Sequence, residues 1–485
     1  MPDDHSDSPE RVGSYPHPLI DRYASPEMAA VFSPRRKAET WRDLWIALAE
    51  TQRELGVEIP AGAVEALREA REEIDLERVA EIERELRHDV MAHVHHYGEV
   101  AEAAKGYIHL GATSAFVTDN ADLLRHRRGL EIVRRRLLGA VSALADFAAE
   151  HRDVPALGYT HLQPAQPTTV GKRACLWIQD LLADLRDVER ALDDLRLRGA
   201  RGTTGTEASF LDLFEGDGEK VDRLNRRLAE RLGFSGVYDV VGQTYPRTVD
   251  RRCLSALAGV GASTARFGHD IRLLQGFGEM EEPFREKQIG SSAMPYKRNP
   301  MRSERICGLS RHLCTLETDA AWTASVQWLE RSLDDSSNRR ISLPESYLTA
   351  DAVLQIVQNV ASGLVVHEPV IRGRLDRYLP FLVTEKVLIA GVRAGGDRQD
   401  LHERIRRHAM EARRRMDEGA SDNDFLDRVA GDPEIPLERD RLEELVVPAE
   451  LVGRAPEQVD RFLQDRVAPR LEEADDVPEE AELRV

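Results

Sequence analysis

Residues 119–151 carry apolar side chains at intervals of three and four positions, over a stretch far longer than an ordinary helix. This spacing places one apolar stripe along an α-helix, whereas the mean helix of a globular protein has only about 11–12 residues. Helices of such length usually bury their stripes against one another in bundles. The chain is therefore expected to contain long helices packed as a bundle.

Four further stretches repeat this spacing and are expected to form long helices, at residues 170–198, 249–276, 301–329 and 345–365. Strand patterns are nearly absent, so the sequence predicts an all-α protein. Residues 253–262 combine small side chains with few charges, which is typical of a helix buried on several sides. Association of subunits would provide the neighbours that such a helix needs.

The chain is expected to have three mostly helical domains, because the long central helices are flanked by regions of different character. Residues 1–113 would form an N-terminal domain of shorter, charged helices, with residues 1–18 disordered. Residues 114–366 would form the central long-helix bundle. Residues 367–485 would form a C-terminal helical domain that prolines and glycines interrupt and an acidic tail ends.

The charge balance argues against two kinds of partner. The chain has 67 basic and 86 acidic residues and a net charge of −19, which disfavours binding to nucleic acid or to an anionic membrane surface. No stretch approaches the roughly 18 continuous apolar residues of a membrane span, and the N-terminus lacks the apolar core of a secretory signal. The four cysteines form no C-x-x-C pair. A soluble, reduced, cytoplasmic protein is expected.

Residues 290–300, with the sequence GSSAMPYKRNP, form the most informative polar segment. Its glycine and two prolines disfavour regular structure, while Ser291 and Ser292 place hydroxyl groups beside two cations. This combination suits a catalytic loop that removes a proton from a carbon atom next to a carboxylate. The alternative is a polar surface loop between two helices. Lys297 is one of only seven lysines in a chain whose other basic residues are arginines, which favours a specific role for it.

Residues 87–96 contain the densest group of histidines in the chain, which makes a metal site an obvious hypothesis. Helical geometry argues against it, because His88 and His93 would differ by about 140° around a helix of 3.6 residues per turn. The later histidines of this segment are equally well explained as solvated or core side chains of an amphipathic helix. His88, between Arg87 and Asp89, is instead a candidate for binding an anion or a substrate. No metal is expected.

Three further polar segments lie between the expected helices. Thr113 and Ser114 precede a long helix, where they would make either an ordinary helix cap or an anion site. His161 follows Thr160 and precedes two Gln-Pro units, on non-helical backbone where a general acid or base would be held. A loop histidine that caps a helix is the alternative. The run at 331–340 is a dense set of donors suited to anions.

These segments together resemble one family. The loop at 291–300 is similar to the signature of the fumarase/aspartase superfamily, and its AMPYKRNP wording is similar to the version in the adenylosuccinate lyase family. The likeness runs in order from about residue 20 to about residue 470. It includes RYASPEM at 22–28, RHD at 87–89, GQT at 242–244 and the run at 331–340.

The resemblance implies cleavage of a C–N bond by β-elimination, with release of fumarate. The implied substrates of purine biosynthesis are adenylosuccinate, which would leave AMP, and SAICAR, which would leave AICAR. Anti elimination needs a base on one face of the succinyl group and an acid on the other. By resemblance, Ser291 is the base, with Ser292 as its competitor, and His161 is the acid. Lys297 and the amides of the Gly-Ser turn would stabilise the ionised serine, and His88 completes the catalytic group.

The resemblance also implies two sets of binding residues. The residues expected to hold the nucleotide and its phosphate are Arg22, Tyr23, Arg305, Arg331, Ser336 and Arg340. The residues expected to surround the succinyl group and the base are Arg87, His88, Asp89, Thr113, Ser114, Thr160, Gln243, Lys297 and Asn299. Because these cations would be gathered in one cleft, an acidic chain and an anionic substrate are compatible.

The fold implied by the resemblance is three helical domains whose central bundle assembles into a homotetramer, with each active site drawing loops from three subunits. It implies no metal or organic cofactor. Two rival interpretations are another lyase of the superfamily, such as argininosuccinate lyase, fumarase or aspartase, and a helical scaffold that has lost the chemistry. The YKRNP wording at 296–300 and the run at 331–340 argue against the first. The presence of all four expected catalytic residues argues against the second.

Overall fold

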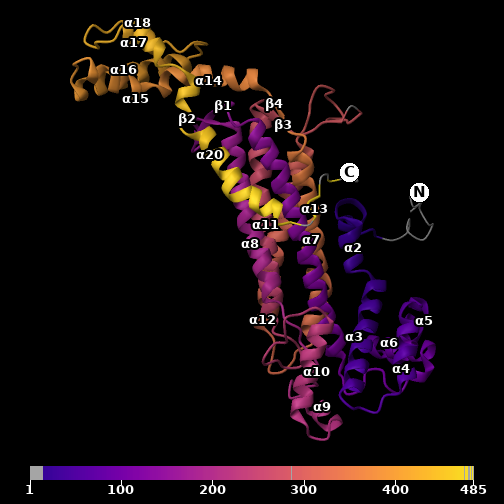
Figure 1. Ribbon diagram of the computed structural model, residues 1–485. Helices are drawn as coiled ribbons and strands as arrows, with labels where there is room; N and C mark the ends of the chain where they lie inside the picture. Colours follow the sequence, from indigo (N-terminus) through magenta and orange to yellow (C-terminus); the bar gives the residue numbers. More distant parts are fainter. Residues whose placement is uncertain (1–14, 286, 475, 479–480, 482, 484–485) are drawn as a thin grey trace.

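The computed structural model describes residues 15–485 except for 286, 475, 479–480, 482 and 484–485. The expected disorder of residues 1–18 therefore falls largely outside the described residues. The described chain is an elongated and mostly helical molecule (Figure 1). The expected all-α fold is confirmed, and within the described residues only four short strands depart from it. No helix in this part of the chain combines the length and the apolar character needed to cross a membrane.

The central bundle consists of five helices of at least 25 residues, counted among the described residues (Figure 1). They are α7 (Ser114–Glu150), α8 (Val170–Asp194), α11 (Thr248–Gly276), α12 (Met301–Ser325) and α13 (Asp334–Ala361). Helix α11 packs against α8, α12 and α13, while α7 packs against α8 and α13. Each bundle helix therefore buries an apolar face against at least two others, and the expected long-helix bundle is confirmed.

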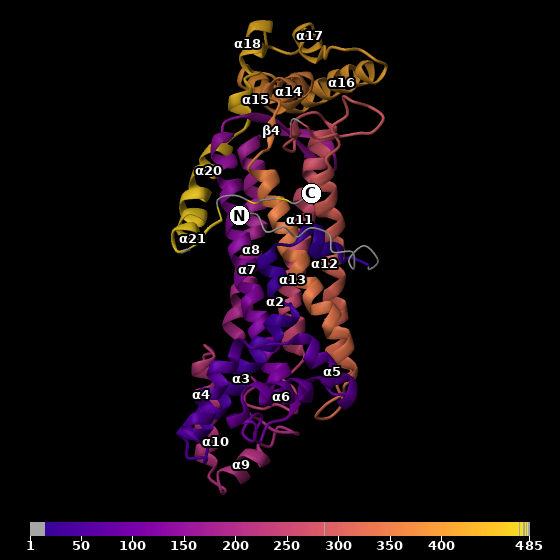
Figure 2. The same ribbon diagram turned by 90° about the vertical axis from the view of Figure 1, so that its right-hand side faces the viewer.

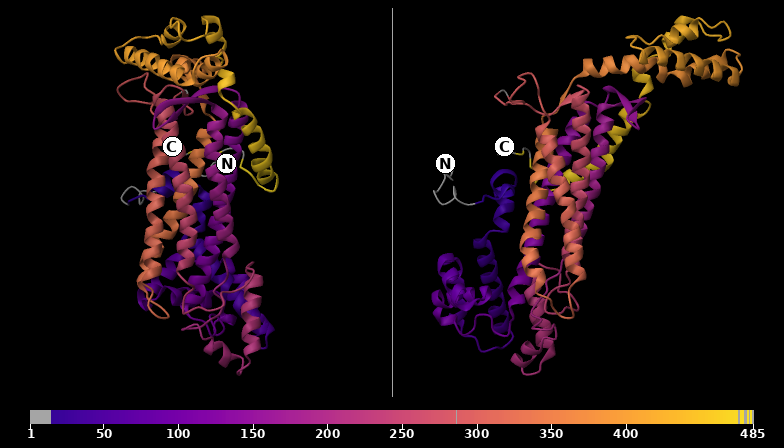
Figure 3. Two further views of the ribbon diagram at one scale, coloured as in Figure 1. Left: turned by 90° about the vertical axis from the view of Figure 1, so that its left-hand side faces the viewer. Right: turned by 180° about the vertical axis from the view of Figure 1, so that it is seen from behind.

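Shorter helices flank one side of the bundle, from its middle to its lower end as Figure 1 shows it. They are η1 (Leu19–Tyr23), α2 (Pro26–Val31), α3 (Pro34–Glu54), α4 (Ala61–Glu69), η2 (Ala70–Glu72), α5 (Leu76–Leu86), α6 (Asp89–Val100) and η3 (Glu102–Ala104). Ser33 caps α3, since its side chain accepts a hydrogen bond from the N–H of Arg36 and Pro34 occupies the first helical position. Helices α9 (Ala208–Leu213) and α10 (Gly218–Arg231) project from the same end, as the view from behind shows (Figure 3).

The expected helix over residues 170–198 ends four residues early, at Asp194. Arg198 explains the difference, because its guanidinium is fully buried and donates to the carbonyls of Gly199, Gly202 and Gln243. Leu197 also donates its N–H to Gly236. A helical backbone cannot supply these contacts, so the chain leaves α8 to reach them.

The last bundle helix, expected over residues 345–365, begins eleven residues earlier, at Asp334, and contains Pro344 in its interior. Proline removes one backbone donor and normally interrupts a helix. Here the first two turns are held by buried ion pairs from Asp335 to Arg247, at 2.7 Å, and from Arg339 to Asp250, at 2.7 Å. Much of the run at 331–340 is therefore helix rather than loop.

The upper end of the bundle carries two small antiparallel sheets. Strands β1 (Pro155–Thr160) and β2 (Gln163–Thr169) form a hairpin between α7 and α8, and β3 (Met280–Glu281) pairs with β4 (Val365–Val366). The hairpin has no recognisable strand pattern in the sequence, because four of its strand positions are Pro or Gly and its faces do not alternate. The loop at 290–300 lies at this same end, between β3 and α12.

The C-terminal helices lie across the upper end and have a core of their own, around Val387, Leu401 and Phe425. They are α14 (Glu368–Leu382), α15 (Thr384–Arg393), α16 (Arg398–Asp417), α17 (Phe425–Ala430), α18 (Arg439–Glu444) and α19 (Pro448–Leu451). These helices begin just after residue 367, where a domain boundary was expected, and that boundary stays a prediction. The chain then returns along α8 and α7 through α20 (Ala455–Phe462), η4 (Leu463–Val467) and α21 (Ala468–Glu472), as Figure 2 shows.

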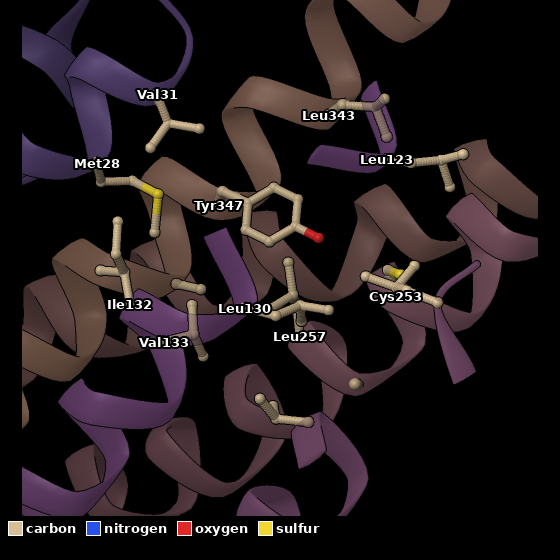
Figure 4. Packing of buried hydrophobic residues seen from close by; sticks show 14 of the residues in the cluster. Met28, Val31, Leu123, Leu130, Ile132, Val133, Cys253, Leu257, Leu343 and Tyr347 are labelled. Atoms are coloured by element: carbon tan, nitrogen blue, oxygen red, sulfur yellow. The ribbon is translucent and has the colours of Figure 1, made fainter. Parts of the chain in front are cut away.

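The core of the bundle extends to the N-terminal segment through Tyr347 of α13 (Figure 4). Leu130 of α7, Leu257 of α11 and Met28 of α2 belong to the same cluster, and all are fully buried. Gly129 permits the close packing of α7 on α13, because a Cβ at this position would lie 2.5 Å from the Tyr347 ring. Helix α2 is thus fixed against the bundle.

Candidate active site

A cavity of about 1070 Å³ opens at the lower end of the bundle, between the N-terminal helices and the first turns of α7 and α13. Eight of the expected substrate residues line it. They are Arg87, His88, Asp89, Ser114, Gln243, Arg331, Ser336 and Arg340. These residues come from four separate parts of the sequence, so the fold brings together what the chain separates.

Helix starts position several of these side chains. His88 is the N-cap of α6, where its Nδ1 accepts a hydrogen bond from the N–H of Met91 at 3.3 Å. Its Nε2 lies 3.5 Å from the hydroxyl of Ser114, the first residue of α7. Thr113 caps α7, and its buried hydroxyl has no hydrogen-bond partner among the described residues. His88 and Ser114, at the starts of α6 and α7, therefore face a common space, as an anion requires, whereas Thr113 is not among the described residues that line the cavity.

The other histidines of the 87–96 segment do not form a metal site. His93 is buried edge-on against Trp41, with ring centroids 4.9 Å apart, and burial lowers the pKa of His93 to about 4. His96 is buried and accepts a hydrogen bond from the N–H of Asp75. Among the described residues, no group of three or more His, Cys, Asp or Glu side chains is placed to hold a metal ion.

One wall of the cavity is formed by a network of buried ion pairs, which the sequence analysis did not predict. Arg247 donates to Asp119 at 3.2 Å and to Asp335 at 2.7 Å, which ties α11 to the first turns of α7 and α13. Although Arg247 is 4% exposed, its pKa stays above the ordinary value: burial alone would lower it, but Asp119 and other carboxylates outweigh that effect. In the sequence, this network is indicated only by acidic residues that interrupt the apolar stripes of the helices. The network fixes the helix ends that carry Ser114, Gln243 and Ser336.

A second layer of the network lies deeper, between α7, α11 and α13. His126 places Nε2 2.9 Å from Asp250 and Nδ1 2.7 Å from the hydroxyl of Tyr347. Burial opposes the charged form of both groups, yet Arg339 and His126 hold the pKa of Asp250 well below its usual range. These buried charges are paired on several sides, as burial demands.

His161 lies at the opposite end of the bundle, at the tip of the β1–β2 hairpin. His161 and Leu162 both have φ of 54°, so the two-residue turn places non-glycine residues in the left-handed region. Thr160 and Gln163 pair across the base of this turn. The His161 side chain is exposed. A strained turn that presents a histidine to solvent is typical of a functional site.

The hairpin is anchored by Glu279, whose carboxylate is completely buried. Tyr159, two residues before His161, donates its hydroxyl to Glu279 at 3.1 Å, and Arg374 of α14 lies 2.9 Å from the same carboxylate. Arg173 of α8 lies 3.9 Å from its other oxygen. The position of His161 is therefore determined by contacts of Glu279 with two helices, α8 and α14.

Ser291 and Lys297 lie in the loop between β3 and α12, also at the upper end. The Ser291 hydroxyl oxygen accepts hydrogen bonds from the backbone N–H of Met294 at 3.1 Å and of Ala293 at 3.4 Å. The Lys297 side chain is exposed, and Asn299 donates to the carbonyl of Gly290 at 2.8 Å, which closes the loop. Two amides aimed at one hydroxyl oxygen would stabilise its ionised form.

Gly290 is needed because the backbone packs closely against it, and not because it adopts a conformation that only glycine can reach. The sequence suggested a flexible start to the loop, but a Cβ at Gly290 would lie only 2.3 Å from the carbonyl oxygen of Lys297. The loop is further held by Glu282, which is 2% exposed and accepts hydrogen bonds from the N–H groups of Arg302 and Ser303, each at 2.9 Å. These contacts fix both ends of the segment that carries Ser291.

The remaining expected residues form a third group, on the side of the bundle. The Arg305 guanidinium of α12 lies 5.4 Å from the ring centroid of Tyr23 in η1, next to Arg22. Helix α11 separates Gln243, just before it, from the Ser291 loop after it, and its 29 residues span about 44 Å. One chain therefore holds the expected residues in three separate places, with Ser291 and His161 at the end opposite the cavity.

Comparison with known proteins matches the chain to two family models. Residues 24–314 match the model described as "Lyase", and residues 380–462 match "Adenylosuccinate lyase C-terminus". The chain is 50% identical over 457 residues to adenylosuccinate lyase of Saccharomyces cerevisiae, covering 94% of this chain and 95% of that protein. It is 35% identical to adenylosuccinate lyase of Pyrococcus horikoshii, covering 92% and 97% respectively.

Solved structures show the same fold. The 3-carboxy-cis,cis-muconate lactonizing enzyme from Pseudomonas putida superposes with a TM-score of 0.81 at 25% identity, covering 94% of this chain and all of that one. A fumarate lyase from Mesorhizobium sp. BNC1 superposes with a TM-score of 0.79 at 25% identity, covering 93% of this chain. With a family model across residues 24–314 and relatives similar over nearly their whole length, this chain belongs to the adenylosuccinate lyase family.

Proposed function

We propose that the protein cleaves adenylosuccinate to AMP and fumarate, and SAICAR to AICAR and fumarate, by β-elimination. The observation that carries this proposal is the set of expected residues lining one cavity, in a chain that belongs to this family. The cavity of about 1070 Å³ is large enough for a nucleotide, and six arginines from separate parts of the described chain line it. The activity named for the relatives is thereby extended to this chain.

In this mechanism Ser291 removes the proton from the carbon next to the succinyl carboxylate. The C–N bond then breaks, fumarate forms, and His161 gives its proton to the departing nitrogen. The two amides that donate to the Ser291 hydroxyl oxygen favour its ionised form, with Lys297 of the same loop adding positive charge. Ser292 has no comparable amide contact among the described residues, which favours Ser291 as the base.

The cavity residues are assigned to substrate binding. Arg331, Ser336 and Arg340 would hold the nucleotide, together with Arg22, Tyr23 and Arg305 from another part of the assembly. His88, with its neighbours Arg87 and Asp89, would face the succinyl group and the base. The residues completing that side would be Thr113, Ser114, Thr160, Gln243, Lys297 and Asn299. The chemistry requires no metal, because proton transfer and fixed positive charges suffice for elimination.

We further propose that the protein acts as a homotetramer whose active sites combine residues of neighbouring subunits. The bundle keeps Ser291 and His161 about 40 Å from the cavity in the same chain, so other chains must supply them. Large apolar side chains near the cavity support this: Trp322, Trp328 and Leu329 are 68%, 73% and 96% exposed in the single chain. Such exposure is typical of a surface that a partner covers.

Action in the cytoplasm is part of the same proposal. The structure has all four cysteines as free thiols, and three of them are buried. A reducing compartment suits such residues.

An absorbance assay with purified protein tests the activity. Conversion of adenylosuccinate to AMP is expected, and turnover of argininosuccinate in its place would overturn the assignment. Absence of turnover with any substrate of the superfamily, in a tetramer that binds AMP, would favour a helical scaffold that has lost the chemistry.

A further inference from the structure

Lys37 is a cation in the lower cavity that the resemblance does not assign. It lies near the start of α3 and lines the cavity on the side formed by α3, α5 and α6. Its ammonium group lies over the ring of Trp41, 4.8 Å from the centroid. Trp41 is buried, so the lysine side chain rests on a fixed aromatic surface.

Lys37 differs from the cations next to it, because it has no carboxylate within 4.0 Å among the described residues. On the same helix, Arg35 and Arg36 both pair with Glu39, at 3.1 and 3.2 Å. Of the seven lysines in the chain, Lys37 is the one that lines this cavity. A cation so placed has its ammonium donors available to a ligand.

Two further cations share this part of the cavity. Arg125 of α7 pairs with Asp122 at 3.0 Å through one terminal nitrogen, but its buried Nε has no hydrogen-bond partner among the described residues. Arg340 of α13 reaches Asp89 at 3.4 Å and is otherwise largely exposed. The three cations come from three different helices, and the charges of Arg125 and Arg340 both act on Lys37.

Of the three cations, Lys37 is the one held at a cost in free energy, because the two arginines each pair with a carboxylate. Burial lowers the pKa of Lys37; Asp89 and Glu83 offset this effect, while Arg125 and Arg340 add to it. A partly buried cation beside two others loses hydration and gains repulsion, and an anion that enters the cavity relieves both costs. A phosphate or carboxylate group has the charge and the oxygen acceptors to do so.

We propose that Lys37, together with Arg125 and Arg340, forms a subsite for an oxyanionic group of the substrate. The inference rests on the proposed function, and it adds Lys37 and Arg125 to the binding residues. The group is either the phosphate of the nucleotide or a carboxylate of the succinyl moiety, since both present charged oxygens. Contact with the Trp41 ring holds the Lys37 ammonium in one place, so the subsite selects a ligand by where its charged group lies as well as by the sign of that charge.

Calorimetric titration with three probes tests the subsite on the full-length protein. AMP carries the phosphate, adenosine lacks it, and fumarate carries only carboxylates. Lys37→Met should weaken binding of AMP or of fumarate by about tenfold or more, the loss expected for one charge-assisted contact. Adenosine binding should be unchanged. Lys105→Met, which removes an exposed lysine outside the cavity, is the matched control.

The probe that is weakened identifies the group, and unchanged affinity for both AMP and fumarate overturns the subsite. Lys37→Arg, which keeps the charge, should recover part of the lost affinity. A measurement on the unaltered protein avoids any folding defect of the variants: AMP or fumarate should slow chemical acetylation of Lys37 but not of Lys105, as followed by mass spectrometry. Equal protection of both lysines would contradict the inference. Turnover of adenylosuccinate by the same unaltered sample shows separately whether the proposed function holds.

Discussion

The backbone N–H of Met294 donates a hydrogen bond to the side-chain oxygen of Ser291 at 3.1 Å, inside the loop that the sequence singled out. This contact distinguishes Ser291 from its neighbour Ser292 by geometry rather than by position in the motif. In the proposed mechanism the same contact would help Ser291 to act as a base, because an amide dipole lowers the free-energy cost of ionising a hydroxyl.

Ser291→Ala should lower kcat by about 10²–10⁴-fold, the usual contribution of a positioned base. Ser292→Ala is the matched control and should keep kcat within an order of magnitude. Steady-state kinetics with adenylosuccinate measures both, and circular dichroism should show a native helical content in each variant. A larger loss in Ser292→Ala than in Ser291→Ala would exchange the roles of the two serines.

The proposed sharing of each active site among three subunits predicts complementation between inactive variants. Ser291→Ala and His161→Ala should each be inactive alone, because each removes one member of the acid and base pair. If the two residues of a site come from different chains, refolding an equal mixture should restore about one quarter of the wild-type activity, since half of the sites receive each intact residue. Activity measured before and after mixing decides this. No recovery in mixed tetramers would place both residues of a site in one chain.

Gly290→Ala should disturb the loop without unfolding the protein. The added methyl group would meet the Lys297 carbonyl at 2.3 Å, so the loop must move. Displacing a catalytic group by about 1 Å can cost roughly a hundredfold in rate, so kcat should fall by that order. Gly308→Ala on α12 is the control, because its Cβ would meet nothing within 4 Å. Equal kcat values for the two variants would mean that the loop tolerates the methyl group.

Glu279→Gln should destabilise the upper end of the bundle. Removing the charge leaves Arg374 and Arg173 facing a neutral group in a fully buried position, and breaking a buried pair costs about 3–5 kcal/mol. Glu281→Gln nearby should cost about 1 kcal/mol or less, because its pair with Arg298 is more exposed. Thermal unfolding followed by circular dichroism compares the two. Unfolding of Glu279→Gln at the wild-type temperature would show that the Glu279 contacts add little stability.

The sequence predicted those parts of the fold that depend on local pattern. Helix α11 was expected at 249–276 and is found at Thr248–Gly276, because apolar periodicity and a clear change of composition mark both ends. The start of α13 was missed, since its first turns are held by Asp335 and Arg339 through partners about 90 residues away. No local pattern contains that information.

The polar segments were found for a related reason. Glycine, proline and hydroxyl residues between apolar stripes stand out in the sequence, so the segments of His88, His161 and Ser291 were all identified. Their arrangement was not predictable from pattern, because it depends on the lengths and directions of the bundle helices. Two features were missed. One is the buried ion network around Arg247, and the other is Lys37, which has no carboxylate within 4.0 Å among the described residues. Both depend on contacts between helices that are distant in the sequence.

Asp184 predicts a measurable dependence of stability on pH. It lies on α8, is 6% exposed, and has one carboxylate oxygen without a hydrogen-bond partner among the described residues. Burial raises the pKa of Asp184 to about 7, and Ser263 only partly offsets this while Asp180 and Asp187 add to it. The folded protein thus prefers the neutral carboxyl, whereas the unfolded chain ionises near pH 4.

The sign follows from which state holds the proton. Between about pH 4 and pH 7 the folded state binds one proton more than the unfolded state, so the free energy of unfolding falls as pH rises through this range. Below it both states are protonated and the penalty vanishes. Above it the penalty is complete and amounts to at most about 4 kcal/mol. Asp184→Asn keeps the shape and removes the titration, so the variant should match wild type at acid pH and exceed it at pH 8.

Comparing the two proteins at each pH removes the contribution of every other titrating group. Denaturant unfolding at several pH values provides the difference in free energy, and exposed Asp193, changed to Asn, is the control on the same helix. The Asp193→Asn difference should stay constant across the range. A constant difference for Asp184→Asn as well would show that Asp184 is ionised in the folded protein at all of these pH values. In that case a partner outside the single chain, such as a cation of a neighbouring subunit, must neutralise it.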